Sequence, residues 1–156
     1  MTRSVRHATF TIERTYDAPP SKVWRAWSDP SEKAAWFSGP EEWGPDEFEL
    51  DFRVGGREIS RGGPPGGPVF TYDATYRDIV PGERFVYAYD MFSDEMRISV
   101  SLGTVELAAV GGGTKLTYTD HGAYLDGADT PEEREHGTRE LLDALGRVLS
   151  GEPTTA

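Results

Sequence analysis

The sequence predicts an α+β fold, in which a curved antiparallel sheet of about seven strands packs against two short helices and one long C-terminal helix. Three observations support this class. The C-terminal segment carries helix start and stop signals around a one-sided apolar stripe. Two short helical segments follow the first strand, and six alternating or aromatic segments then succeed one another with only turns between them. Helices that are segregated from an antiparallel sheet in this way are typical of α+β domains.

Length and composition limit the possible functions. The 156 residues fit one domain, which we place at residues 7–150, with residues 1–6 and 151–156 as flexible termini. The 27 acidic residues outnumber the 16 basic ones, and the net charge of −11 disfavours a nucleic-acid partner. The lack of cysteine excludes disulfides and thiolate metal sites and indicates the cytoplasm. No apolar run approaches the roughly 20 residues that cross a bilayer, so no membrane insertion is expected.

The first strand is predicted over residues 7–17, where apolar and polar side chains alternate. Its apolar face comprises Ala8, Phe10, Ile12 and Tyr16. Arg14 shares that face, and two interpretations of it remain open. It either pairs with a loop carboxylate and holds the end of the strand, or it binds a carboxylate on a ligand.

Two short helices are predicted after the prolines at positions 19 and 20. The first repeats Val23 and Trp27 at helical spacing, and the second begins at Asp29, a capping residue followed by proline. Trp36 comes just before a Gly-Pro break, so three of the four tryptophans lie in this helical pair. Their rings either anchor the helices to the sheet or stack on a ligand, and both roles can hold for different rings.

The clearest strand spans residues 46–54, where Phe48 and Leu50 alternate with acidic residues. Gly55 and Gly56 suit a two-residue hairpin turn that returns through residues 57–60. Residues 62–68 consist only of glycine and proline and predict a surface loop. Because this loop does not lead into a helix N-terminus, its glycines do not indicate a phosphate site.

Two aromatic strands are predicted next, over residues 69–79 and 84–91, joined by a Val-Pro-Gly-Glu turn. Their alternating aromatic positions are Phe70, Tyr72, Tyr76, Phe85, Tyr87 and Tyr89. On the concave face of a curved sheet such rings line a pocket or pack as ordinary core, and the sequence alone supports both equally.

Residues 97–109 form a strand with a change of phase. Val100 and Leu102 alternate before Gly103, whereas Val105 and Leu107 alternate after it. A β-bulge at Gly103 would supply the slip of one residue and bring all four apolar side chains to the inner face.

The last strand is predicted over residues 114–120, with Leu116 and Tyr118 inward, and a loop through residues 124–127 then leads to the long helix. This helix spans Thr130–Ser150, begins with a Thr-Pro-Glu-Glu capping box and ends at Gly151 and Pro153. The apolar stripe of its second half consists of Leu141, Leu142, Leu145, Val148 and Leu149. In its first half Gly137 and Thr138 replace large apolar side chains. Either a cavity lies beneath them, as we expect, or the helix packs closely against an aromatic ring of a strand.

Several separated motifs resemble the START-like, or SRPBCC, superfamily. They are Arg14 to Trp27, Asp29-Pro30, Trp36-Phe37, Asp78 to Tyr87 and Gly113 to Thr117. More narrowly, they resemble the family named for the activator of the heat-shock-protein-90 ATPase. The resemblance implies a helix-grip fold, as in the birch pollen allergen and lipid-transfer domains, with a hydrophobic cavity between the sheet and the C-terminal helix. It also implies a kinship with aromatases and cyclases that act on polyketides, but it brings no catalytic residue set.

Three functions follow, of which we favour binding of a small hydrophobic or aromatic molecule. The alternatives are a cofactor-free cyclase or aromatase acting on a polyketide-like substrate, and a protein-interaction or chaperone co-regulator module. The residues expected to contact a ligand are Trp27, Trp36, Phe48, Leu50, Phe70, Tyr72, Tyr87, Tyr89, Val100, Leu102, Gly137, Thr138, Leu141 and Leu142. Arg14 and His121 are candidate polar anchors. No metal site or cofactor is predicted, because the three histidines share no metal-ligand spacing on one element.

Overall fold

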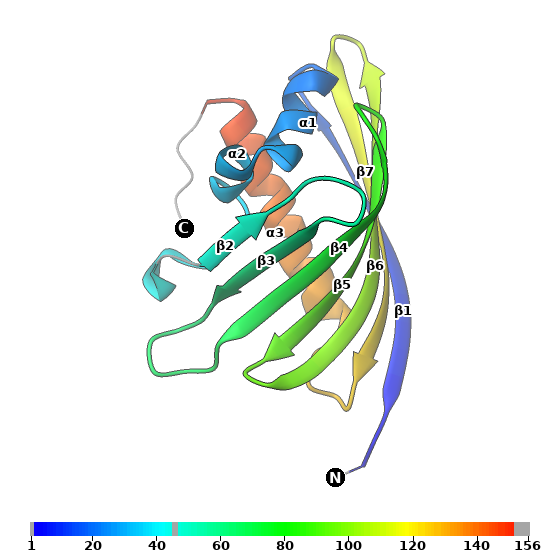
Figure 1. Cartoon of the computed structure of the whole chain (residues 1–156). Coiled ribbons are helices and arrows are strands. Elements are labelled where there is room, and N and C mark those ends of the chain that lie inside the picture. The colour runs from blue at the N-terminus through cyan, green and yellow to red at the C-terminus, as the bar shows by residue number, and fades with distance from the viewer. Residues whose placement is uncertain (1, 45–46, 152–156) are drawn as a thin grey trace.

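The chain folds as one antiparallel sheet that curls around a long helix (Figure 1). The computed structural model describes residues 2–44 and 47–151. The strands are β1 Val5–Tyr16, β2 Glu47–Leu50, β3 Arg57–Gly62, β4 Phe70–Val80, β5 Arg84–Ser93, β6 Met96–Val110 and β7 Gly113–Leu125. The helices are α1 Pro20–Ser28, α2 Pro30–Ala34, the 3-10 turn η1 Glu41–Trp43, and α3 Pro131–Leu149.

The strand order is β1-β7-β6-β5-β4-β3-β2, so the first strand of the chain pairs with the last. Figure 1 shows the three α-helices on the concave side of this sheet, with α3 running across it. The predicted α+β, helix-grip architecture is therefore confirmed. β1 begins at Val5, inside the segment assigned to the N-terminal tail. None of the helices in the described part of the chain is both long and apolar enough to span a membrane.

Local capping signals explain where the helices begin. The Asp29 carboxylate accepts hydrogen bonds from the backbone N–H groups of Ser31 and Glu32, each at 3.0 Å. At α3 the Thr130 hydroxyl accepts from the N–H of Glu133 at 3.1 Å. The reciprocal bond of the predicted capping box is made differently, because the Thr130 N–H donates to the Asp129 carboxylate at 2.8 Å. Gly151 follows the helix at φ +82°, as expected for a terminating glycine, whereas Pro153 lies outside the described residues.

The connection between β2 and β3 is wider than predicted. The N–H of Asp51 donates to the Arg57 carbonyl at 3.0 Å, and the chain leaves the strand after Leu50 instead of continuing to Val54. Val54 is 58% exposed, while the Phe52 ring turns into the core against Tyr76 and Phe85. The predicted two-residue turn at Gly55 and Gly56 is therefore wrong. The start of the predicted strand, Asp46, lies outside the described residues.

The predicted bulge at Gly103 is also wrong. The pairing of β6 with β7 runs without interruption from Ser99 to Val110, and the register shift against β5 lies between Met91 and Phe92. Gly103 lies on the inner face of the sheet. A Cβ there would lie 2.5 Å from Cζ of Tyr87, so the glycine makes room for the tyrosine ring. As a result, Val100 and Leu102 face outward and are 43% and 41% exposed.

A buried ion pair ties α2 to the sheet. The ammonium group of Lys33 lies 2.7 Å from the Glu58 carboxylate on β3, and the two residues are only 2% and 0% exposed. The Tyr76 hydroxyl donates a second hydrogen bond to Glu58. Burial lowers the pKa of Lys33, and its attraction to Glu58 opposes that shift. Neither charged residue stood out in the sequence, since each lies within an otherwise ordinary polar stretch.

Candidate ligand-binding cavity

A cavity of about 1300 Å³ lies between the sheet and α3. Its walls come from the segment between α2 and η1, from strands β2 to β5 and β7, and from α3 between Glu133 and Arg147. This volume exceeds the roughly 300–1,000 Å³ that is typical of small-molecule sites. The fold therefore has room for a ligand at the place where the first half of α3 was expected to be thin.

Most residues predicted to contact a ligand line this cavity. They are Trp27, Trp36, Phe48, Phe70, Tyr72, Tyr87, Tyr89, Gly137, Thr138, Leu141 and Leu142. Three predicted residues do not. Leu50 packs against the core, and Val100 and Leu102 lie on the opposite face of the sheet, because the strand has no bulge at Gly103.

The small side chains on α3 border open space. A Cβ built on Gly137 would have no non-helical atom within 4 Å. The hydroxyl of Thr138 donates to the Arg134 carbonyl at 2.8 Å, so its polar group is satisfied within the helix. Close packing against a strand aromatic, the other explanation for this pair, is absent at Gly137.

Aromatic rings form a continuous wall of the cavity. Tyr72 lies with its ring centroid 5.1 Å from that of Tyr89 and 5.1 Å from that of Phe37. Trp27 and Trp36 pack edge to face at 4.7 Å, and Nε1 of Trp36 donates to a backbone carbonyl of α1 at 2.9 Å. These two tryptophans thus anchor the helical pair and line the cavity at the same time. No hydrogen bond joins the Tyr72 hydroxyl to another described residue, which leaves it available to a ligand.

Polar groups converge at one end of the cavity. Asp120 is fully buried, and its carboxylate accepts hydrogen bonds from the hydroxyls of Tyr89 and, at 3.0 Å, Tyr118. The Tyr87 hydroxyl lies 2.9 Å from that of Tyr118 and must donate to it, because the Tyr118 proton is used on Asp120. Arg134 donates to the Tyr89 hydroxyl at 3.0 Å. We call these five residues the tyrosine cluster.

The tyrosine cluster presents protonated phenols. Burial raises the pKa of Tyr87 and of Tyr118 well above the ordinary value, and burial also raises the pKa of Tyr89. Burial raises the pKa of Asp120 as well, and its tyrosine partners and Arg134 oppose that shift. The three phenols line the cavity whereas Asp120 does not, so the carboxylate orients the hydroxyls from behind.

The side-chain carboxyl carbon of Asp120 is expected to titrate above the ordinary aspartate pKa of about 3.9 in an NMR pH titration, because its burial penalises the charged form. A raised folded-state pKa means that the proton on Asp120 stabilises the fold fully below the unfolded pKa. This stabilisation is lost as the pH rises through the folded-state pKa.

Asp126 is the matched control in the same titration. Hydrogen bonds from the Ser4 N–H and from Arg3 lower its pKa, so it is expected to titrate below the ordinary value. If Asp120 titrates at or below the pKa of Asp126, the carboxylate is not held as the structure shows.

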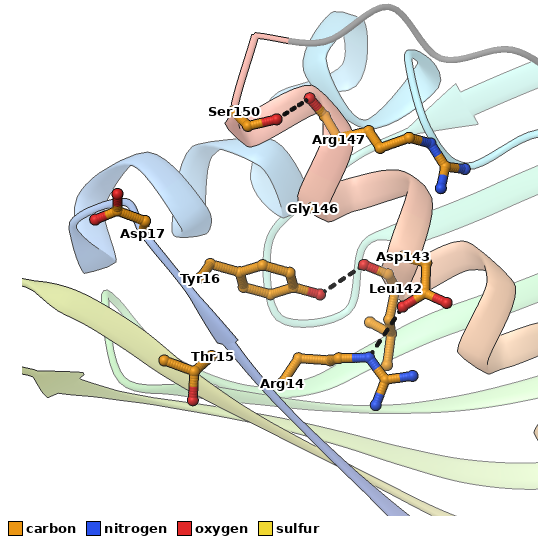
Figure 2. A pocket seen from close by; sticks show the side chains of 9 residues that line it. All are labelled: Arg14, Thr15, Tyr16, Asp17, Leu142, Asp143, Gly146, Arg147 and Ser150. Atoms are coloured by element: carbon orange, nitrogen blue, oxygen red, sulfur yellow. Dashed lines mark hydrogen bonds and ion pairs between the residues drawn. The ribbon is translucent and has the colours of Figure 1, made fainter.

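The two predicted polar anchors lie outside the cavity. Nε of Arg14 donates to the carboxylate of Asp143 at 3.1 Å, so the arginine pairs with a carboxylate on α3 instead of on a loop. Figure 2 shows this pair beside the Tyr16 hydroxyl, which donates to the Leu142 carbonyl at 2.7 Å, in a separate pocket of about 390 Å³.

His121 lies on the outer face of the sheet, with Nδ1 2.7 Å from the Thr9 hydroxyl. β7 continues to Leu125 instead of ending at residue 120, so His121 lies within the strand and its side chain points to the opposite face from that of Asp120. Asp120, its neighbour in sequence, takes the inward position. The inward alternation of Leu116 and Tyr118 could have identified Asp120, since the next position on that face is 120.

No three histidine, cysteine or carboxylate side chains come together as a metal site within residues 2–44 and 47–151. What the cavity offers chemically is an aromatic wall, one free phenol at Tyr72 and the hydrogen-bonded phenols of the tyrosine cluster. Such a surface suits a flat or elongated apolar molecule that carries few polar groups.

Known proteins are similar to this chain in sequence and in fold. The model of the family described as "Activator of Hsp90 ATPase homolog 1-like protein" matches residues 17–150. An uncharacterised protein from Rhizobium leguminosarum is 44% identical, with a TM-score of 0.92 over 97% of this chain and 100% of that chain. Mll3558 from Rhizobium loti is 48% identical, with a TM-score of 0.85 over 92% of this chain and 97% of that chain.

A more distant likeness shows the fold alone. DynU16, from the dynemicin biosynthetic locus, is 19% identical, with a TM-score of 0.69 over 95% of this chain and 49% of that chain. Among curated proteins, none matches this chain.

Proposed function

Because the chain belongs to the family of Activator of Hsp90 ATPase homolog 1-like proteins, we propose that it uses the cavity of its fold to bind a small hydrophobic or aromatic molecule. The observation that carries this proposal is the cavity of about 1300 Å³ beneath Gly137, where an added Cβ would meet no neighbour. Binding of an apolar ligand in a space of that size is favourable, because the ligand displaces water and buries its apolar surface against the aromatic rings of the walls.

The test uses protein purified under native conditions. We expect native mass spectrometry to detect a bound small molecule, or uptake of the neutral probe N-phenyl-1-naphthylamine, and solvent extraction to release it. Trp27, Trp36 and Trp43 line the cavity, so bound probe should quench most of the tryptophan fluorescence. Absence of any adduct, together with unchanged tryptophan fluorescence across fatty acids, flavonoids and aromatic polyketides, contradicts a binding function.

The tyrosine cluster favours one second candidate, a cofactor-free cyclase or dehydratase. The three phenols of the cluster spend their protons on Asp120 and on each other, whereas the Tyr72 phenol, whose ring packs on Tyr89, is free. The Tyr72 hydroxyl can donate a hydrogen bond to a carbonyl oxygen as negative charge develops on it. The same mass measurement separates the two functions. A carrier returns an added polyketide-like ligand unchanged, whereas an enzyme returns a product whose mass is lower by one water.

A further inference from the structure

Arg147 has no partner for its side-chain charge among the described residues. It lines both the large cavity and the small pocket beside Arg14, and its Nε atom is buried without a hydrogen bond. Figure 2 shows its guanidinium pointing away from Arg14 and Tyr16. The cation is therefore not part of the small pocket's hydrogen-bonded groups and is free to serve the larger cavity.

This arginine differs from nearly every other arginine in the described chain. Each of the following has a carboxylate within ion-pair distance: Arg3, Arg6, Arg14, Arg25, Arg53, Arg57, Arg61, Arg84, Arg97, Arg134 and Arg139. Arg77 is exposed on β4 and also lacks a carboxylate partner within residues 2–44 and 47–151. In a protein with 27 acidic and 16 basic residues, an unpaired arginine at a partly buried position needs an explanation.

The acidic groups nearest to Arg147 along α3 are already paired. Asp143, one turn earlier, accepts from Arg14, and Glu140 lies 2.6 Å from His136. A buried guanidinium donor without an acceptor costs free energy that an anionic partner would recover. The planar guanidinium matches the geometry of a carboxylate, with two parallel hydrogen bonds.

We propose that the ligand of the cavity is amphipathic and carries one anionic head group, which pairs with Arg147. This inference rests on the proposed binding function and adds the chemistry and orientation of the ligand. Arg147 follows Gly137 by ten residues, about 15 Å along the helix axis. The apolar body of the ligand then extends from Arg147 beneath Gly137 and Thr138 toward the aromatic wall.

The test compares two probes with the same ring skeleton. N-phenyl-1-naphthylamine is neutral, and 1-anilinonaphthalene-8-sulfonate adds one anionic group. We expect the sulfonate to bind the wild-type protein more tightly, although the net charge of −11 repels anions. Arg147→Gln is expected to weaken sulfonate binding about tenfold, the size of one charge-assisted hydrogen-bonded pair, and to change binding of the neutral probe by less than about twofold.

Two further variants sharpen the comparison. Arg77→Gln makes the same charge change on the outer surface and should leave both affinities unchanged, which excludes a general field effect. Arg147→Lys keeps the charge without the planar fork and should retain part of the preference for the sulfonate. Thermal melts confirm that each variant is folded, and displacement of the sulfonate probe by dodecanoate but not by dodecanol extends the result to carboxylates.

The outcomes separate the inference from the function on which it rests. If both probes bind and Arg147→Gln alters neither affinity, the cavity binds ligands but Arg147 is not the anchor, and the inference is overturned. If neither probe binds the wild-type protein, the proposed function fails and the inference falls with it.

Discussion

Glu58→Ala is expected to lower the free energy of unfolding by about 3 to 5 kcal/mol, the usual result of removing one partner from a buried ion pair. Lys33 and Glu58 are 2% and 0% exposed, so water cannot replace the lost carboxylate. The Tyr76 hydroxyl, which donates to Glu58, loses its acceptor in the same variant. Urea denaturation followed by tryptophan fluorescence measures the effect.

The loss is expected to depend on pH in one direction. Burial lowers the pKa of Lys33, and Glu58 is the group that opposes this shift, so the pKa falls further in the variant. In the unfolded chain Lys33 keeps the ordinary pKa of 10.5. Between the lowered pKa of the folded variant and 10.5, the unfolded chain therefore binds more protons than the folded variant. The stability of the variant then rises with pH. The destabilisation relative to the wild type should shrink as the pH rises from the lowered pKa of Lys33 in the variant to its pKa in the wild type, and should stay constant above that.

Two controls isolate the buried charge. Asp73→Ala removes the carboxylate of the solvent-exposed pair with Arg57, which also joins β3 to β4, and should cost about 1 kcal/mol or less. The double variant Lys33→Met with Glu58→Leu removes both charges and should be much closer to the wild type than Glu58→Ala is. A loss for Glu58→Ala no larger than that for Asp73→Ala would show that the pair is not buried.

Local signals in the sequence predict the helices and most strands. The hydroxyl of Thr130 and the carboxylate of Asp29 cap their helices where the pattern indicates, because a cap satisfies N–H groups only two or three residues away. The turn at residues 80–83 has Gly82 at φ +78°, which its Pro-Gly dipeptide predicts. These features depend on neighbours in sequence, so no knowledge of the tertiary fold is needed.

The prediction for β6 failed because it assumed that apolar side chains point inward. Ser99, Ser101 and Gly103 occupy the inner face instead, where they leave room for the tyrosine rings of β5 and β7. Val100 and Leu102 are consequently on the outer face. A bulky aromatic face on one strand requires small residues on its neighbour, and that requirement becomes visible only when the register of the two strands is known.

The candidate site was predicted in its apolar part and missed in its polar part. Strand alternation identifies the tyrosines, since each ring position follows from period two. The partners of their hydroxyls come from other elements, as when Tyr89 on β5 meets Asp120 on β7 and Arg134 on α3. Such contacts join residues that are far apart in the chain, and no local spacing encodes them.

Gly137→Leu is expected to abolish uptake of N-phenyl-1-naphthylamine while leaving the melting temperature equal or higher. Gly137 lines the cavity, and a Cβ at this position meets no non-helical atom within 4 Å, so a leucine side chain has room to extend toward the cavity. Replacing a helix-interior glycine also removes a propensity cost of about 1 kcal/mol, which corresponds to a gain of about 2 to 4 °C in a domain of this size. Thr138→Trp fills the cavity from the adjacent position and should block uptake in the same way.

Gly146→Leu is the matched control on the same helix. A Cβ on Gly146 would lie 3.1 Å from Cε1 of Tyr16, and the Tyr16 hydroxyl is fixed by its bond to the Leu142 carbonyl, so the ring cannot move aside freely. Overpacking here should destabilise by about 1 to 3 kcal/mol despite the same gain in helix propensity. The probe should still bind, because Gly146 lines the small pocket and not the cavity. If Gly137→Leu instead lowers the melting temperature and the probe still binds, the first half of α3 packs against protein. The proposal that this cavity binds the ligand then loses its main support.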